Sequence, residues 1–166
     1  MMWGKKKING TVYDLTHLDP FNMPIGLPGG RETTLQVQFG CHVFTENFTP
    51  LHDRALAFSD GRDLRAFCLK RYGYCLSLPS AVKQAVDERV YLDNQGRTHI
   101  SGELPGLEGC YLIGFKLRER QTKKFDAVMQ IKTAHHRKVV EALPSAPFRV
   151  YVSAFLKGRK VDWKKK

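Results

Sequence analysis

The stretch CYLIGFKLRERQTKKFDAVMQIKTAH, residues 110 to 135, decides the fold that the sequence predicts. Apolar and polar residues alternate on both sides of a charged centre, which is the period-two pattern of two paired β-strands. One face carries Tyr111, Ile113, Phe115, Leu117, Phe125, Ala127, Met129 and Ile131. The other face carries Lys116, Arg118, Gln130 and Lys132. The hairpin therefore predicts a sheet with one buried face and one cationic face.

The remaining sequence predicts more strands and two short helices. Alternation predicts strands over 7–13, 33–45 and 147–157 and a hairpin over 89–101, while helical spacing predicts helices over 60–73 and 80–89. We therefore expect a single compact α+β domain, residues 1–166, with a twisted antiparallel sheet of about five to seven strands and two short helices packed on one face. Within it, 19–32 should form an irregular loop, and 158–166 a basic tail that could be disordered.

Composition excludes several classes of protein. A chain of 166 residues can bury a core without help from disulfides or metal. It has no run of about 18 apolar residues, so a membrane-spanning helix is not expected. Its lysine-rich start is not followed by an apolar segment, which argues against a secretory signal. The four cysteines form no C-x-x-C pair. We expect a cytoplasmic protein without metal or other cofactor.

Positive charge is concentrated in three segments. The net charge is +11, and the stretch 116–138 alone has eight basic and two acidic residues. Lys5 to Lys7 and the tail 157–166 hold most of the rest, although the tail could also be a flexible solubility segment. Concentrated positive charge is typical of a surface that meets a polyanion, and we expect nucleic acid, RNA rather than DNA. The predicted contacts are Lys116, Arg118, Arg120, Lys123, Lys124, Lys132 and Arg137.

Histidines supply the candidates for acid–base chemistry. In QVQFGCHVFTENFTPLHD, residues 36 to 53, alternation places Cys41 in the core and His42 on the polar face. His42 is therefore the first catalytic candidate, with His52, beside Asp53, and His135 as second choices. The alternative is that these are a sheet-face histidine and solvated loop histidines. His135 and His136 should point to opposite faces, which makes them a poor metal pair.

Basic residues also fall on the helix expected over 60–73, where helical spacing permits ion pairs with Asp60 and Asp63 and contact with phosphate is the alternative. They are Arg62, Arg65, Lys70 and Arg71. The acidic residues are scattered, which argues against a two-metal nuclease. A metal-independent route, in which a base activates the ribose 2′-hydroxyl and cations stabilise the phosphorane, fits better and works only on RNA.

The segment CHVFT followed by DGRDLRAFCLKRY resembles small proteins of bacterial mobile elements and of toxin or defence loci, over residues 36 to 75 at most. This resemblance brings no established catalytic residues. A small basic antiparallel sheet with short helices is also similar in outline to the RelE and barnase-like toxin ribonucleases, which is an analogy of fold.

Two hypotheses follow. The first is a cytoplasmic RNA-directed toxin or defence-associated protein that works as a metal-independent ribonuclease, with an antitoxin as a potential partner. The second is a non-catalytic module that binds nucleic acid or a ribonucleoprotein in a mobile-element system; it predicts salt-sensitive binding and no cleavage. Neither needs a membrane. An inhibitor that mimics phosphate would be acidic, so the net charge argues against that class.

Overall fold

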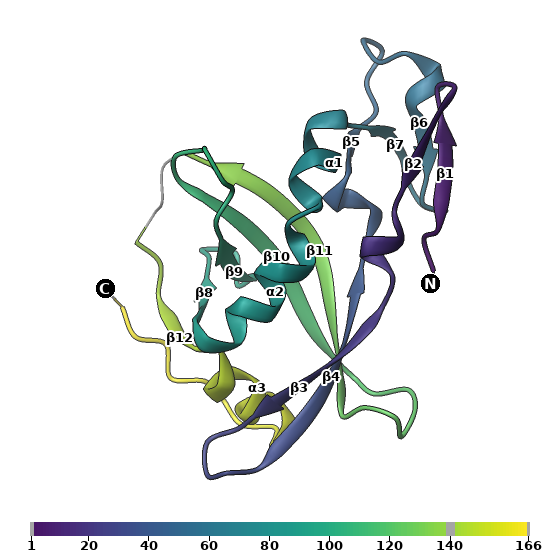
Figure 1. The fold of residues 1–166 in the computed structure, drawn as a ribbon. Coiled ribbons are helices and arrows are strands. Elements are labelled where there is room, and N and C mark those ends of the chain that lie inside the picture. The colour runs from purple at the N-terminus through teal and green to yellow at the C-terminus, as the bar shows by residue number, and fades with distance from the viewer. Residues whose placement is uncertain (1, 139–141, 166) are drawn as a thin grey trace.

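A computed structural model describes residues 2–138 and 142–165 and contains three β-sheets and three short α-helices (Figure 1). The largest sheet has the order β12-β8-β9-β10-β11-β4-β3. Its strands are β3 (Phe21–Gly26), β4 (Glu32–Phe39), β8 (Arg89–Leu92), β9 (Thr98–Gly102), β10 (Cys110–Glu119), β11 (Ala127–Arg137) and β12 (Ser145–Pro147). The smaller sheets are the hairpin β1 (Lys5–Ile8) and β2 (Thr11–Asp14) and the trio β5 (Thr45–Asn47), β7 (Leu64–Phe67) and β6 (Ala57–Ser59).

The predicted central hairpin is confirmed as β10 and β11, and the hairpin predicted over 89–101 is confirmed as β8 and β9. The register of β10 and β11 shifts between Gly114 and Phe115, so that Lys132 is an extra residue in β11. Such a bulge increases the local twist of the sheet. The apolar face predicted for the hairpin is buried throughout, including Tyr111, Ile113 and Met129.

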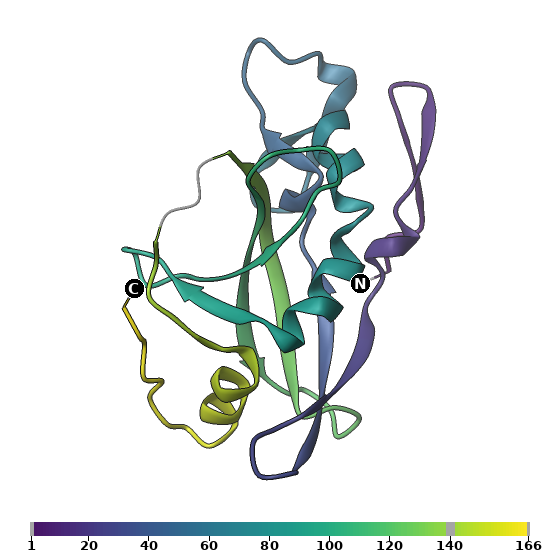
Figure 2. The ribbon, with the colours of Figure 1, turned by 60° about the vertical axis from the view of Figure 1, so that its left-hand side comes forward.

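Three helices pack on that apolar face: α1 (Leu69–Cys75), α2 (Leu78–Gln84) and α3 (Phe148–Leu156). Tyr74 of α1 contacts the ring of Tyr111, and Phe148 of α3 contacts the ring of Phe115. In α2, Ala81 lies so close to Gly102 that a Cβ on the glycine would be 2.9 Å away. Figure 2 shows α1 and α2 following one another along the sheet. The predicted α+β class with helices on one face is confirmed.

One strand pair departs from the expected antiparallel sheet. β4 runs parallel to β11, whereas its other neighbour, β3, is antiparallel to it. Two parallel neighbouring strands need a long crossover connection, and here the whole chain between Phe39 and Ala127 forms that connection. The sheet is therefore mixed, and β3 forms one of its edges.

Several predicted segments differ in the structure. The expected strand 7–13 is the β1-β2 hairpin, which turns at Asn9 and Gly10. The expected loop 19–32 contains β3, where Pro24 is tolerated because an edge strand need not donate every hydrogen bond. The expected helix 60–73 is strand β7 followed by α1, since residues 65–67 are all buried between β5 and β6. The expected strand 147–157 is helix α3, which buries Phe148 and Val152 at helical spacing.

The basic tail, for which the sequence leaves disorder open, lies against the edge of the sheet over the described residues 158–165. Ser145 and Lys164 exchange two backbone hydrogen bonds of 3.0 Å, and the ring of Trp163 packs on Tyr151 at 5.8 Å. The tail thus extends the edge of the sheet beside β12.

Candidate nucleic-acid interface

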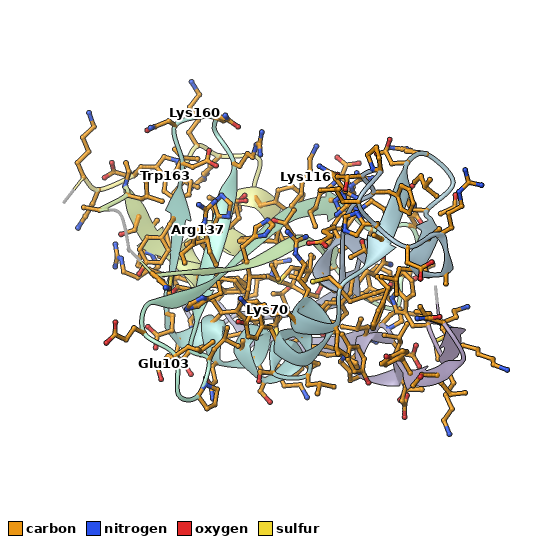
Figure 3. All side chains as sticks on the ribbon, turned by 90° about the horizontal axis from the view of Figure 1, so that it is seen from above. Lys70, Glu103, Lys116, Arg137, Lys160 and Trp163 are labelled. Atoms are coloured by element: carbon orange, nitrogen blue, oxygen red, sulfur yellow. The ribbon has the colours of Figure 1, made fainter. Side chains whose placement is uncertain are left out.

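The face of the large sheet opposite the helices, here called the open face, carries polar and basic side chains from three adjacent strands. They are Gln36 and Gln38 of β4, Lys116 and Arg118 of β10, and Gln130 and Lys132 of β11. Gln38, Gln130 and Lys116 stand opposite one another in a single row. Figure 3 shows Lys116 on the other side of the sheet from Lys70 of α1. The predicted cationic face exists as a surface.

Positive charges crowd the centre of the open face. Partial burial lowers the pKa of Lys132, and the charges of Arg118, Lys116 and Arg62 lower it further. In residues 2–138 and 142–165, no carboxylate lies within ion-pair distance of these four side chains. A bound polyanion would relieve this repulsion.

Next to Lys132 along β11, the open face deepens into a pocket of about 440 Å³, here called the histidine pocket. Its lining includes Asp93, His99, Ser101, Thr133, His135 and Arg137. Gly114 of β10 lies between the lining residues His99 and Thr133, because it pairs with both. A Cβ there would lie only 2.5 Å from Thr133 Oγ1. The glycine thus allows side chains from β9 and β11 to meet across β10.

The two histidines of this pocket have different surroundings. Burial lowers the pKa of His135 to about 4, and the positive charges of Arg71 and Arg137 act in the same direction. His135 is therefore neutral at pH 7 and can accept a proton. His99 Nε2 lies 3.0 Å from Asp93 Oδ2. Burial would raise the pKa of Asp93, but hydrogen bonds from His99 and two backbone amides outweigh it, so that pKa is lowered.

His42 does not lie on a strand, so its predicted placement beside Gln36 and Gln38 is wrong. β4 ends at Phe39, and Cys41–Val43 form a short 3-10 turn in which the Phe44 amide donates to Cys41 O. The turn buries both Val43 and Phe44, which an extended strand would point to opposite faces. The prediction that Cys41 lies in the core is confirmed.

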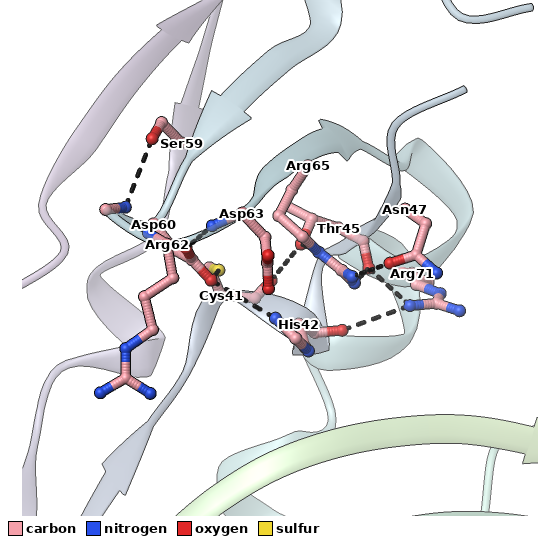
Figure 4. Close-up of polar contacts among 11 residues, drawn as sticks. Cys41, His42, Thr45, Asn47, Ser59, Asp60, Arg62, Asp63, Arg65 and Arg71 are labelled. Carbon is pink, nitrogen blue, oxygen red and sulfur yellow. Dashed lines mark hydrogen bonds and ion pairs between the residues drawn. The ribbon is translucent and has the colours of Figure 1, made fainter. Parts of the chain in front are cut away.

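The turn brings His42 to a carboxylate from a distant loop. His42 Nε2 lies 3.5 Å from Asp60 Oδ2, and about a third of the histidine side chain is exposed (Figure 4). Hydrogen bonds from the amides of Asp63 and Arg62 lower the pKa of Asp60 to about 2. Burial raises the pKa of the neighbouring Cys41 thiol, and the charge of Asp60 raises it further.

Two arginines predicted on a helix instead support the backbone beside this turn. Arg65, on β7, is buried and donates to Thr45 Oγ1, Thr45 O and Asn47 Oδ1. Arg71, on α1, donates to the carbonyl oxygens of His42 and Thr45. Neither arginine forms the ion pair with an aspartate that the sequence suggested, because their N–H groups donate to uncharged carbonyl, hydroxyl and amide oxygens instead (Figure 4).

The remaining predicted site residues are dispersed. His52 lies in the loop after β5, and its Nε2 is 2.7 Å from Oε1 of Glu46 in that strand. Asp53 caps a different turn and does not orient the imidazole. Arg120 lies 3.9 Å from Asp126 in the loop between β10 and β11, which also holds the exposed Lys123 and Lys124. Arg137 lies at the opposite end of β11, in the histidine pocket.

Three residues of these sites were missed from the sequence: Asp60, Asp93 and His99. Alternation in RTHIS, residues 97 to 101, does separate His99 and Ser101 from the buried Ile100, so a local signal for His99 was present. No local signal links Asp60 to His42, because their contact depends on how the loop before β7 folds back.

Comparison with known protein families relates most of the sequence to one of them. The sequence model of the YjaZ family matches residues 5–156. The chain belongs to the YjaZ family. No curated protein and no solved structure matches this YjaZ-family chain. None of the helices in its described residues has both the length and the apolar character to cross a membrane.

Proposed function

We propose that this YjaZ-family protein binds single-stranded RNA on the open face of its large sheet. The observation that carries the proposal is the grouping of Lys116, Arg118 and Lys132 on two adjacent strands, with no described carboxylate paired to them. Cations arranged along a sheet can follow a phosphate backbone. The proposal includes a cytoplasmic setting, which fits the four free thiols.

Uncharged polar side chains on the same face also support a ligand that makes hydrogen bonds. Gln36 and Gln38 of β4 and Gln130 of β11 are half-buried on this face. Amide groups suit the edges of unpaired bases. Glutamines beside cations therefore favour a nucleic acid over a simple anion.

Titration with a labelled single-stranded RNA at several salt concentrations tests this proposal. We expect the logarithm of the association constant to fall linearly with the logarithm of the salt concentration, because bound phosphates release counterions. Single-stranded DNA and a heparin-like polyanion are the comparisons. Binding that is absent at low salt, or that does not change with salt, would contradict the proposal.

RNA cleavage in the histidine pocket is a second candidate function, favoured by the neutral His135, which lies on β11 between the basic residues Lys132 and Arg137. In this reaction His135 takes the proton of a ribose 2′-hydroxyl, and the 2′-oxygen attacks phosphorus. The bond to the 5′-oxygen breaks, leaving a 2′,3′-cyclic phosphate; the 5′-oxygen takes a proton from solvent water, and His135 returns its proton to solvent. His99 is the second imidazole in the pocket, and Arg137 provides positive charge for the phosphorane.

Replacing His135 by glutamine is expected to reduce such cleavage at least about 100-fold while RNA binding remains. Because only the neutral imidazole is a base, the wild-type rate should stay level from pH 7 to pH 5 and fall near pH 4. Product formation from labelled RNA, in the presence of a chelator, measures both effects.

His52→Gln is the matched control for that experiment, because His52 lies in the loop after β5 and not in the pocket. Its cleavage rate should equal the wild-type rate. Binding without cleavage by any variant would instead support the non-catalytic module. The resemblance to toxin loci extends the proposal to growth arrest on expression in bacteria, relieved by a cognate antitoxin.

A further inference from the structure

Cys41, His42 and Asp60 bring three different metal-ligand atoms together outside the proposed RNA-binding face. In the described residues, their sulfur, nitrogen and carboxylate oxygen atoms all lie within 4.8 Å of one another. Cys41 Sγ is 3.8 Å from Asp60 Oδ2, and His42 Nε2 is 3.5 Å from the same oxygen. Zinc bond lengths of about 2.0 to 2.3 Å place tetrahedral ligands about 3.3 to 3.8 Å apart. The distances from Asp60 Oδ2 to Cys41 Sγ and to His42 Nε2 therefore already lie within the range for a tetrahedral zinc site.

The backbone orients the carboxylate toward the other two groups. Asp60 Oδ1 accepts hydrogen bonds of 2.8 Å from the amides of Arg62 and Asp63. This leaves Oδ2 directed at the thiol and the imidazole (Figure 4). A ligand held in this way by its own hydrogen bonds needs little reorganisation to bind a metal.

The other two ligands are fixed by the turn after β4. Cys41 and His42 are consecutive residues of this 3-10 turn, and Thr45 Oγ1 donates a 2.8 Å hydrogen bond to Cys41 O. Cys41 is buried while His42 and Asp60 are accessible, so an ion could enter from solvent and meet the thiol at the inner end. Sulfur, nitrogen and oxygen ligands together suit zinc, and do not suit magnesium or calcium.

We propose that Cys41, His42 and Asp60 form a binding site for a zinc ion with three protein ligands and one position left for water. This site does not depend on RNA binding. It is an alternative to acid–base use of His42, since the metal would occupy the Nε2 atom that such a role requires. Three ligands with an open fourth position are the arrangement of zinc ions that activate water.

The experiment is a titration of the chelator-treated full chain with Zn²⁺ against a competing indicator, followed by the same titration with Co²⁺. We expect one equivalent to bind and the cobalt form to show a thiolate-to-metal absorption band. Cys41→Ser should abolish the band and weaken zinc binding at least about tenfold. Asp60→Asn should also weaken binding at least about tenfold but keep the band. The asparagine Oδ1 can still accept the hydrogen bonds from the amides of Arg62 and Asp63, so the fold should be retained.

Cys68→Ser is the matched cysteine control and should bind metal as the wild type does. Cys75→Ser tests the one competing thiol–imidazole contact among the described residues, that of Cys75 Sγ with His17 Nε2 at 3.2 Å. Loss of the band in Cys75→Ser but not in Cys41→Ser would overturn the proposal. Equal affinity in wild type, Cys41→Ser and Asp60→Asn would overturn it too, as would no binding by the wild type. RNA titrations of the same variants report separately on the open face.

Discussion

Replacing Lys116, Arg118 and Lys132 together by alanine is expected to weaken RNA binding by at least about tenfold at moderate salt. The three side chains are exposed on adjacent strands, and charge repulsion contributes to the lowered pKa of Lys132. If each side chain contacts one phosphate, the plot of the logarithm of the association constant against the logarithm of the salt concentration should become less steep. Its slope should fall in magnitude by about 2, since each phosphate contact with a single strand contributes about 0.7. The measurement is the salt titration of labelled RNA, repeated with the triple variant.

The matched control replaces Lys5, Lys6 and Lys7 by alanine. It removes the same net charge from exposed side chains of β1, which belongs to the separate β1-β2 hairpin. If binding reflects only the overall charge of +11, the two triple variants should lose affinity equally. Equal losses would therefore contradict an interface on the open face, whereas a selective loss in the Lys116, Arg118 and Lys132 variant would support it.

Phe44→Ala is expected to lower the free energy of unfolding by about 3 to 5 kcal/mol. Phe44 is fully buried, and its ring lies 5.4 Å from the rings of both Trp3 and Phe58. It thus joins the N-terminal segment to the β5-β7-β6 sheet inside one continuous core. Alanine would leave a cavity where these parts meet, and urea unfolding followed by circular dichroism measures the loss.

Leu51→Ala is the control for that measurement. Leu51 is 97% exposed, so its removal should change the free energy of unfolding by no more than about 0.5 kcal/mol. A loss below about 1 kcal/mol for Phe44→Ala would mean that the aromatic cluster collapses around the missing ring. In that case the β5-β7-β6 sheet would not depend on Phe44 for its attachment.

The open face could be predicted from the sequence, whereas the histidine pocket could not. Alternation alone assigned Lys116, Arg118 and Lys132 to the polar side of β10 and β11, because successive residues of a strand point to opposite faces. The same rule failed at His42, where the chain leaves the strand in order to bury Val43 and Phe44. It failed again in α3, whose β-branched and aromatic residues have strand propensity but pack as a helix on Phe115.

The sequence by itself determined the α+β class, the two central hairpins and the cationic side of the sheet, because each follows from the period of side chains along one segment. Only the tertiary structure decided that β4 lies parallel beside β11, that His99 and His135 share a pocket, and that Asp60 reaches Cys41 and His42. These contacts join residues distant in the chain. They depend on strand register, a bulge and a loop that folds back, and all three are set by packing of the whole core.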